Sequence, residues 1–123
     1  MDENRPLIDV IDVDGRDLFV DAERLGGDVL VVLGTASCGA CRRARQLLAV
    51  LSSGAFGEPP MAFFYVDAAH AMGLVEDWEV FHLPALMLLR DGEAWARVQA
   101  PLEAKALASA VRAARAGSCD PQL

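Results

Sequence analysis

The fold of this chain is decided by residues 29–48, VLVVLGTASCGACRRARQLL. The stretch opens with five consecutive apolar residues rich in valine, which is the pattern of a strand buried on both faces. Small residues follow, and Ser37 is of a type that commonly caps the amino end of a helix. From Cys41 onward, apolar residues recur at the spacing of a helix. Cys38 is therefore predicted to lie where a buried strand passes into a helix.

That position favours a reactive cysteine. Free backbone N–H groups and the positive end of the helix dipole stabilise an anion there, and the thiolate is the reactive form of cysteine. Cys41 follows within one helical turn, so the two thiols are close enough to close a small disulfide ring. Gly39 and Ala40 have too little bulk to obstruct a partner. The C-x-x-C spacing near such a strand is typical of redox sites, although it also begins many zinc sites.

Composition limits the classes of function. The chain has 123 residues, 54% hydrophobic and 24% charged, which indicates one globular domain with an adequate core. A net charge of −7 argues against a nucleic-acid partner, and three cysteines, an odd number, argue against a secreted disulfide framework. No apolar leader follows the polar first residues, and no run is long enough to cross a membrane. We expect a cytoplasmic monomer without membrane or nucleic-acid partners.

The rest of the chain predicts alternating strands and helices. Strands are expected at 7–13, 61–66, 85–89 and 93–99, and helices at 17–25, 68–78 and from Pro101 to about 115. The order βαβαββα gives a central mixed sheet with helices on both faces, an α/β fold. One domain should occupy residues 1–123, with its core at about 7–116 and a flexible tail at 117–123.

On these residues the sequence resembles the thioredoxin family over about 7–116. Three features carry the resemblance: the strand leading into Cys38-Gly39-Ala40-Cys41, the strand ending at Asp67, and residues 83–93, LPALMLLRDGE. The resemblance implies a thioredoxin-like fold with a cis bond between Leu83 and Pro84, facing the cysteine pair.

The resemblance also implies an activity. Cys38 would be the exposed nucleophile that attacks a substrate disulfide, and Cys41 would resolve the mixed disulfide. The expected function is a thiol–disulfide oxidoreductase of cell redox homeostasis, with no metal and no organic cofactor. Its partners would be protein or small disulfide substrates and a thiol reductant such as a thioredoxin reductase or glutathione.

Substrate contacts are expected on both sides of the cysteine pair. In the family, the backbone of the residue before the cis-proline, here Leu83, holds an extended substrate segment beside Pro84. On the helix side we expect Ser37, Gly39 and Ala40 to contact the same segment.

The sequence departs from the family at five positions. Ser37 replaces a tryptophan, Ala40 a proline, Val32 a buried acid, Phe63 the lysine usually paired with that acid, and Ala100 a glycine near the substrate groove. Absence of the buried acid and of the tryptophan favours an alternative function. The alternative is a binding or assembly module that holds a partner chain in the groove beside Pro84, with little turnover. Retention of both cysteines favours the enzyme.

His82, two residues before Pro84, leaves three interpretations open. As an imidazolium it would lower a thiolate pKa, it would transfer protons in place of the missing acid, or it is a histidine of a surface loop. A structural zinc at the cysteine pair would need two more ligands, and only His70, His82 and Cys119 are available.

Overall fold

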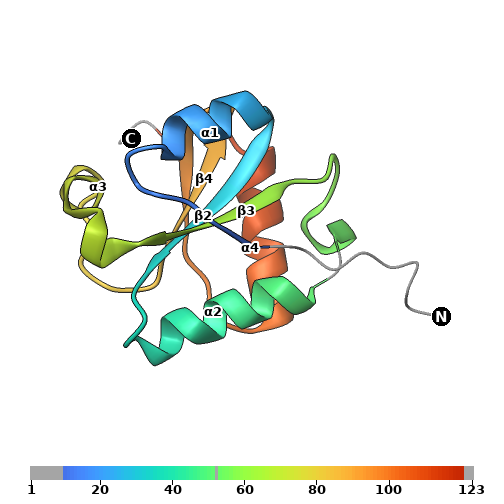
Figure 1. The fold of residues 1–123 in the computed structure, drawn as a ribbon. Coiled ribbons are helices and arrows are strands. Elements are labelled where there is room, and N and C mark those ends of the chain that lie inside the picture. Colours follow the sequence, from blue (N-terminus) through green and yellow to red (C-terminus); the bar gives the residue numbers. More distant parts are fainter. Residues whose placement is uncertain (1–9, 52, 121–123) are drawn as a thin grey trace.

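One mixed sheet of five strands organises the computed structural model, which describes residues 10–51 and 53–120 (Figure 1). The strands are β1 (Val10–Asp12), β2 (Asp28–Gly34), β3 (Ala62–Asp67), β4 (Ala85–Arg90) and β5 (Glu93–Val98), in the order β1-β3-β2-β4-β5. The helices are α1 (Leu18–Leu25), α2 (Gly39–Val50), α3 (Met72–Asp77) and α4 (Ala104–Ala116), with 3-10 turns η2 (Ser53–Phe56) and η3 (Ala68–His70). The predicted α/β fold with a mixed sheet is confirmed.

Strand β2 lies at the centre of this sheet. It pairs in parallel with β3 on one side and antiparallel with β4 on the other. Every residue from Val29 to Gly34 is buried. Because neighbouring strands satisfy its backbone and helices cover both faces, an unbroken apolar run is stable there. The predicted strand buried on both faces is confirmed.

The two faces of the sheet carry separate apolar cores. Val29, Val31 and Leu33 of β2 pack in the core that includes residues of α1 and α3. Leu30 and Val32, which point the opposite way, pack in the core that includes residues of α2 and α4. Figure 1 shows α1 and α2 on opposite sides of the sheet. The alternation of side chains along one strand therefore supplies both layers.

Two predicted helices differ in their bounds. The segment 68–78 is not one helix, because Asp67 caps the short turn η3 by accepting from the N–H of Ala69 at 3.0 Å, and Ala71 then leaves the helical conformation before α3 begins. The closing helix begins at Ala104 instead of Pro101, because Glu103 is still extended.

The expected bounds of the other elements agree more closely with the structure, although residues 7–9 of the first predicted strand lie outside the described residues. At the other end of the chain, α4 ends at Ala116, close to the predicted end at about 115, and Gly117 caps it. The N–H of Asp120 then donates to the carbonyl oxygen of Trp95 on β5 at 2.8 Å.

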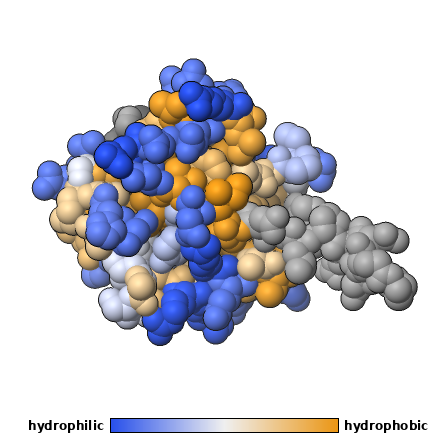
Figure 2. Space-filling model, viewed as in Figure 1, coloured by the Kyte–Doolittle hydropathy of each residue, from blue (hydrophilic) through white to orange (hydrophobic). Residues whose placement is uncertain are grey.

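Hydrophilic side chains cover most of the face in Figure 2, and apolar groups show between them near its middle. Within the ranges 10–51 and 53–120, no helix is both long and apolar enough to cross a membrane.

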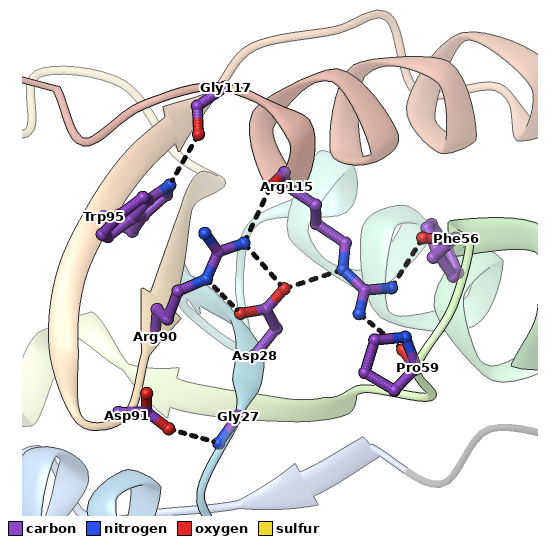
Figure 3. A network of polar contacts seen from close by, with 9 residues as sticks. All are labelled: Gly27, Asp28, Phe56, Pro59, Arg90, Asp91, Trp95, Arg115 and Gly117. Atoms are coloured by element: carbon purple, nitrogen blue, oxygen red, sulfur yellow. Dashed lines mark hydrogen bonds and ion pairs between the residues drawn. The ribbon is translucent and has the colours of Figure 1, made fainter.

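An ion cluster lies at the amino end of β2 (Figure 3). The Asp28 carboxylate accepts from Arg90 Nε at 2.7 Å and from Arg115 Nε at 2.8 Å. The side chains of Asp28 and Arg115 are only 9% and 8% exposed. Arg115 also donates to the carbonyl oxygen of Phe56, and the Arg90 guanidinium lies 4.3 Å from the centroid of the Trp95 ring. The cluster therefore joins β2, β4, β5, α4 and η2.

Replacing Asp28 with Asn should lower the free energy of unfolding at pH 7 by about 3 kcal/mol, because two guanidiniums would lose their carboxylate where little water replaces it. Burial raises the pKa of Asp28, but the hydrogen bonds from Arg90 and Arg115 lower it by more, so the folded pKa lies below the ordinary 3.8. The stabilisation is therefore complete above pH 3.8 and is lost as the pH falls through the folded value. Denaturant unfolding at pH 7 and in acid should show the two proteins converging in acid.

Asp14→Asn is the matched control. Asp14 pairs with Arg16 at the surface, where ion pairs contribute little. If both variants lost the same stability at pH 7, the buried cluster would not be the source of the effect.

Candidate active site

Cys38 caps the amino end of α2. Its backbone is extended, with φ −90° and ψ 112°, and α2 begins at the next residue. The backbone N–H of Cys41 donates to Cys38 Sγ at 3.1 Å. The predicted cap, Ser37, is wrong by one residue, because the sulfur of Cys38 lies over the first helical turn and itself satisfies one of the free N–H groups.

Cys38 and Cys41 form a disulfide, and their Cα atoms lie 5.2 Å apart. The two residues differ in exposure, since Cys41 is completely buried and Cys38 is half-buried. Ser37, Gly39 and Ala40 are all exposed beside Cys38. A molecule that approaches from solvent therefore meets Cys38 before Cys41.

The segment that faces the disulfide comes from the loop before β4. The Leu83–Pro84 bond is cis, as predicted. The carbonyl oxygen of Leu83 lies 3.9 Å from Cys38 Sγ, although 45 positions separate the two residues in the sequence. The fold therefore places a backbone carbonyl and a proline ring next to the more accessible sulfur.

A cavity of about 360 Å³ borders Pro84 on the side of β5. His82 and Phe81 line it, together with Arg97 and Ala100. His82 is exposed, and Phe81 is 83% exposed, which is unusual for an aromatic side chain. The cavity therefore brings an exposed aromatic ring and an imidazole close to Pro84.

A second cavity, of about 530 Å³, lies at the carboxyl ends of β1, β3 and β2. Its lining includes the side chains of Asp12, Arg42, Arg45, Tyr65 and Asp67. Arg45 donates to both carboxylate oxygens of Asp12. Charged groups from a strand end and from α2 thus meet behind the first turn of α2.

Tyr65 is a residue of this site that the sequence did not single out. A Cβ atom added at Gly34 would lie 2.5 Å from the Tyr65 hydroxyl oxygen and 2.9 Å from Cys41 Sγ. The hydroxyl and the buried sulfur therefore both border the space that the missing side chain of Gly34 leaves open. The guanidinium of Arg45 covers the tyrosine ring at 4.8 Å from its centroid.

One sequence signal could have found Tyr65: it lies two residues after Phe63 in the same strand, so both side chains share a face. The structure adds that Tyr65 pairs in register with Val32 of β2. Val32 and Phe63 are the positions at which the resemblance led us to expect an acid and a lysine. Both are buried in the apolar core, at 0% and 1% exposure.

The other candidate residues lie apart from the disulfide. His70 is exposed, with Nε2 3.7 Å from a carboxylate oxygen of Asp67. Cys119 is exposed near β5, with its sulfur 3.9 Å from the carbonyl oxygen of Ala94. In the part of the chain that the structure describes, no group of three or more His, Cys, Asp or Glu side chains is arranged to hold a metal ion.

A five-stranded mixed sheet with a disulfide at the start of the helix after its central strand defines a thioredoxin-fold domain. Among solved structures, a point mutant of thioredoxin from Halobacterium salinarum NRC-1 is similar, with 20% identity, a TM-score of 0.66, and coverage of 87% of this chain and 91% of that chain. The short form of thioredoxin f from spinach chloroplast is similar with 18% identity and a TM-score of 0.66, over 89% and 96% of the two chains. No curated protein sequence matches the chain.

The sequence model of the thioredoxin family matches residues 20–113, and the chain belongs to that family. Membership and the disulfide of Cys38 with Cys41 together support a thioredoxin-like redox role.

In the reduced protein, Cys38 should react with limiting iodoacetamide at a rate at least about ten times that of Cys41. Cys38 is the more exposed residue and its sulfur lies at the helix start, which favours the thiolate. Peptide mass spectrometry of a Cys119→Ser variant measures both rates, because that variant removes the other exposed thiol. Faster labelling of Cys41 would reverse the roles assigned to the two cysteines.

Proposed function

We propose that this protein is a thiol–disulfide oxidoreductase that reduces or exchanges disulfides in protein substrates through Cys38 and Cys41. The observation that carries this proposal is the disulfide at the start of α2, with one accessible and one buried sulfur, beside the Leu83–Pro84 segment. An asymmetric pair of this kind suits two successive exchange steps.

In the first step the Cys38 thiolate attacks one sulfur of a substrate disulfide. A bond forms between Cys38 and the substrate, the substrate S–S bond breaks, and one substrate sulfur leaves as a thiolate that takes up a proton. In the second step Cys41 loses its proton and attacks Cys38 Sγ. The Cys38–Cys41 bond forms, the second substrate thiolate leaves, and two electrons have passed from the protein to the substrate.

We propose that substrate lies along the groove beside Pro84, with its backbone against Leu83. The exposed residues Ser37, Gly39 and Ala40 would contact it from the helix side. A thiol reductant, such as a thioredoxin reductase or glutathione, would restore both thiols. A monomer in the cytoplasm, where thiols are kept reduced, fits this cycle.

We also propose that His82 protonates the substrate thiolate that leaves in the first step. Support for this role is its exposure and its place in the wall of the cavity that borders Pro84. Imidazole is the side chain that gains and loses a proton near neutral pH.

A second function is favoured by one observation, the apolar environment of Val32 and Phe63. Without an acid there, resolution by Cys41 would be slow, and the domain would serve as a binding or assembly module that holds a partner chain beside Pro84. The two functions differ in turnover.

The protein should catalyse reduction of insulin disulfides by dithiothreitol, measured as turbidity from the released chains. Cys38→Ser should return the rate to the uncatalysed background, because no nucleophile remains to start the exchange. Cys41→Ser should accumulate a mixed disulfide between Cys38 and insulin, visible by non-reducing electrophoresis.

Cys119→Ser is the control and should keep the wild-type rate, since Cys119 lies near β5. A wild-type protein that binds insulin chains without accelerating their reduction would contradict the oxidoreductase and support the binding module.

A further inference from the structure

The buried sulfur of the site lies near the hydroxyl of a tyrosine. Cys41 is completely buried, and its sulfur and the Tyr65 hydroxyl oxygen both lie within 2.9 Å of the position that a Cβ atom of Gly34 would occupy. Since a Cβ atom at Gly34 would approach both within 2.9 Å, only a glycine lets the two groups occupy these positions. Within the described ranges the hydroxyl has no hydrogen-bond partner in the oxidised protein.

The tyrosine ring is held in place from several sides. Tyr65 pairs in register with Val32 of β2 and with Asp12 of β1. Arg45 of α2 covers its ring at 4.8 Å and is itself bound to the Asp12 carboxylate. An ion pair between α2 and β1 thus lies against the Tyr65 ring.

Resolution of a mixed disulfide requires a thiolate at Cys41. Burial disfavours that anion unless a hydrogen-bond donor faces it. Val32, on the same face of β2 as Gly34, has no polar atom in its side chain. Besides the N–H groups at the start of its own helix, the Tyr65 hydroxyl is a polar group that the structure places near the Cys41 sulfur.

We propose that the Tyr65 hydroxyl donates a hydrogen bond to the Cys41 thiolate and so promotes the resolving step, an inference that rests on the proposed oxidoreductase function. As the Cys41 S–H bond breaks, its proton passes to solvent in the cavity of about 530 Å³ that Tyr65 lines. The thiolate then attacks Cys38 Sγ, the Cys38–Cys41 bond forms, and the substrate thiolate leaves.

The charges around Tyr65 keep it a donor. Burial raises the pKa of Tyr65 above 10.0, Arg45 lowers it, and Asp67 and Asp12 raise it again, with a net increase. The phenol therefore retains its proton at neutral pH and cannot act as a base. Asp14 and Arg42 line the same cavity.

The test measures the ionisation of Cys41 without any redox reaction. In a Cys38→Ser protein with ¹³Cβ-labelled cysteine, the two remaining thiols are Cys41 and Cys119, and serine keeps the helix cap. Adding Tyr65→Phe removes one oxygen and keeps the ring. We expect the pKa of Cys41 to rise, so that its thiolate fraction at neutral pH falls about tenfold, as loss of one hydrogen bond to a charged group implies. Cys119 serves as the internal control and should not change.

A second variant should shift the pKa of Cys41 in the opposite direction. The chain has one tyrosine, so biosynthetic incorporation of 3-fluorotyrosine changes Tyr65 alone. Fluorine makes the phenol a stronger hydrogen-bond donor, and the pKa of Cys41 should fall below that of the unfluorinated protein. In the protein with both cysteines, Tyr65→Phe should slow resolution about tenfold and leave attack by Cys38 unchanged.

An unchanged Cys41 titration in Tyr65→Phe, or a shift in the same direction in both variants, would overturn the inference. This result is separable from failure of the proposed function. An inactive wild-type protein whose Cys41 titration still depends on the hydroxyl would contradict the oxidoreductase and leave the hydrogen bond supported.

Discussion

The burial of β2 on all sides is the constraint from which the rest of the structure follows. A strand that pairs with β3 and β4 and is covered on both faces must be apolar throughout its length. Its side chains alternate between the two faces, so they contribute to two separate cores. Such a strand can carry polar or reactive groups only at its ends. Both functional features of this protein, the ion cluster and the disulfide, lie there.

The two ends of β2 have different roles. At the amino end, Asp28 pairs with two guanidiniums and joins α4 to the sheet. At the carboxyl end, Gly34 omits a side chain, and the space it leaves brings the Cys41 sulfur and the Tyr65 hydroxyl together. The stability of the domain and the chemistry of the thiols thus depend on different residues of one strand. A substitution at one end of β2 should affect the residues at the other end mainly by shifting the strand.

Features encoded within short segments could be predicted from the sequence. The buried run before Cys38, the C-x-x-C spacing and the hairpin after Pro84 each predict their own structure, and the family resemblance indicated the cis bond at Pro84. Contacts between distant segments could not be predicted, because no local pattern records which side chains a register brings together. In the sequence, nothing marks Asp28 as the partner of Arg115, which lies 87 positions later. Tyr65 is likewise one aromatic residue in an apolar strand. The cap of α2 was misplaced because a sulfur atom replaced the usual oxygen acceptor.

The shielding of Asp28 and Arg115 has a consequence for the choice of buffer. Dissolved ions screen solvent-exposed charges that are separated by more than a Debye length, about 8 Å at physiological ionic strength, and screen buried pairs much less. With side chains only 9% and 8% exposed, this pair is largely inaccessible to them. Ionic strength should therefore alter the folded domain much less than acidity does, so a redox assay can be run over a wide range of salt concentrations while the sheet that carries the thiols keeps its structure.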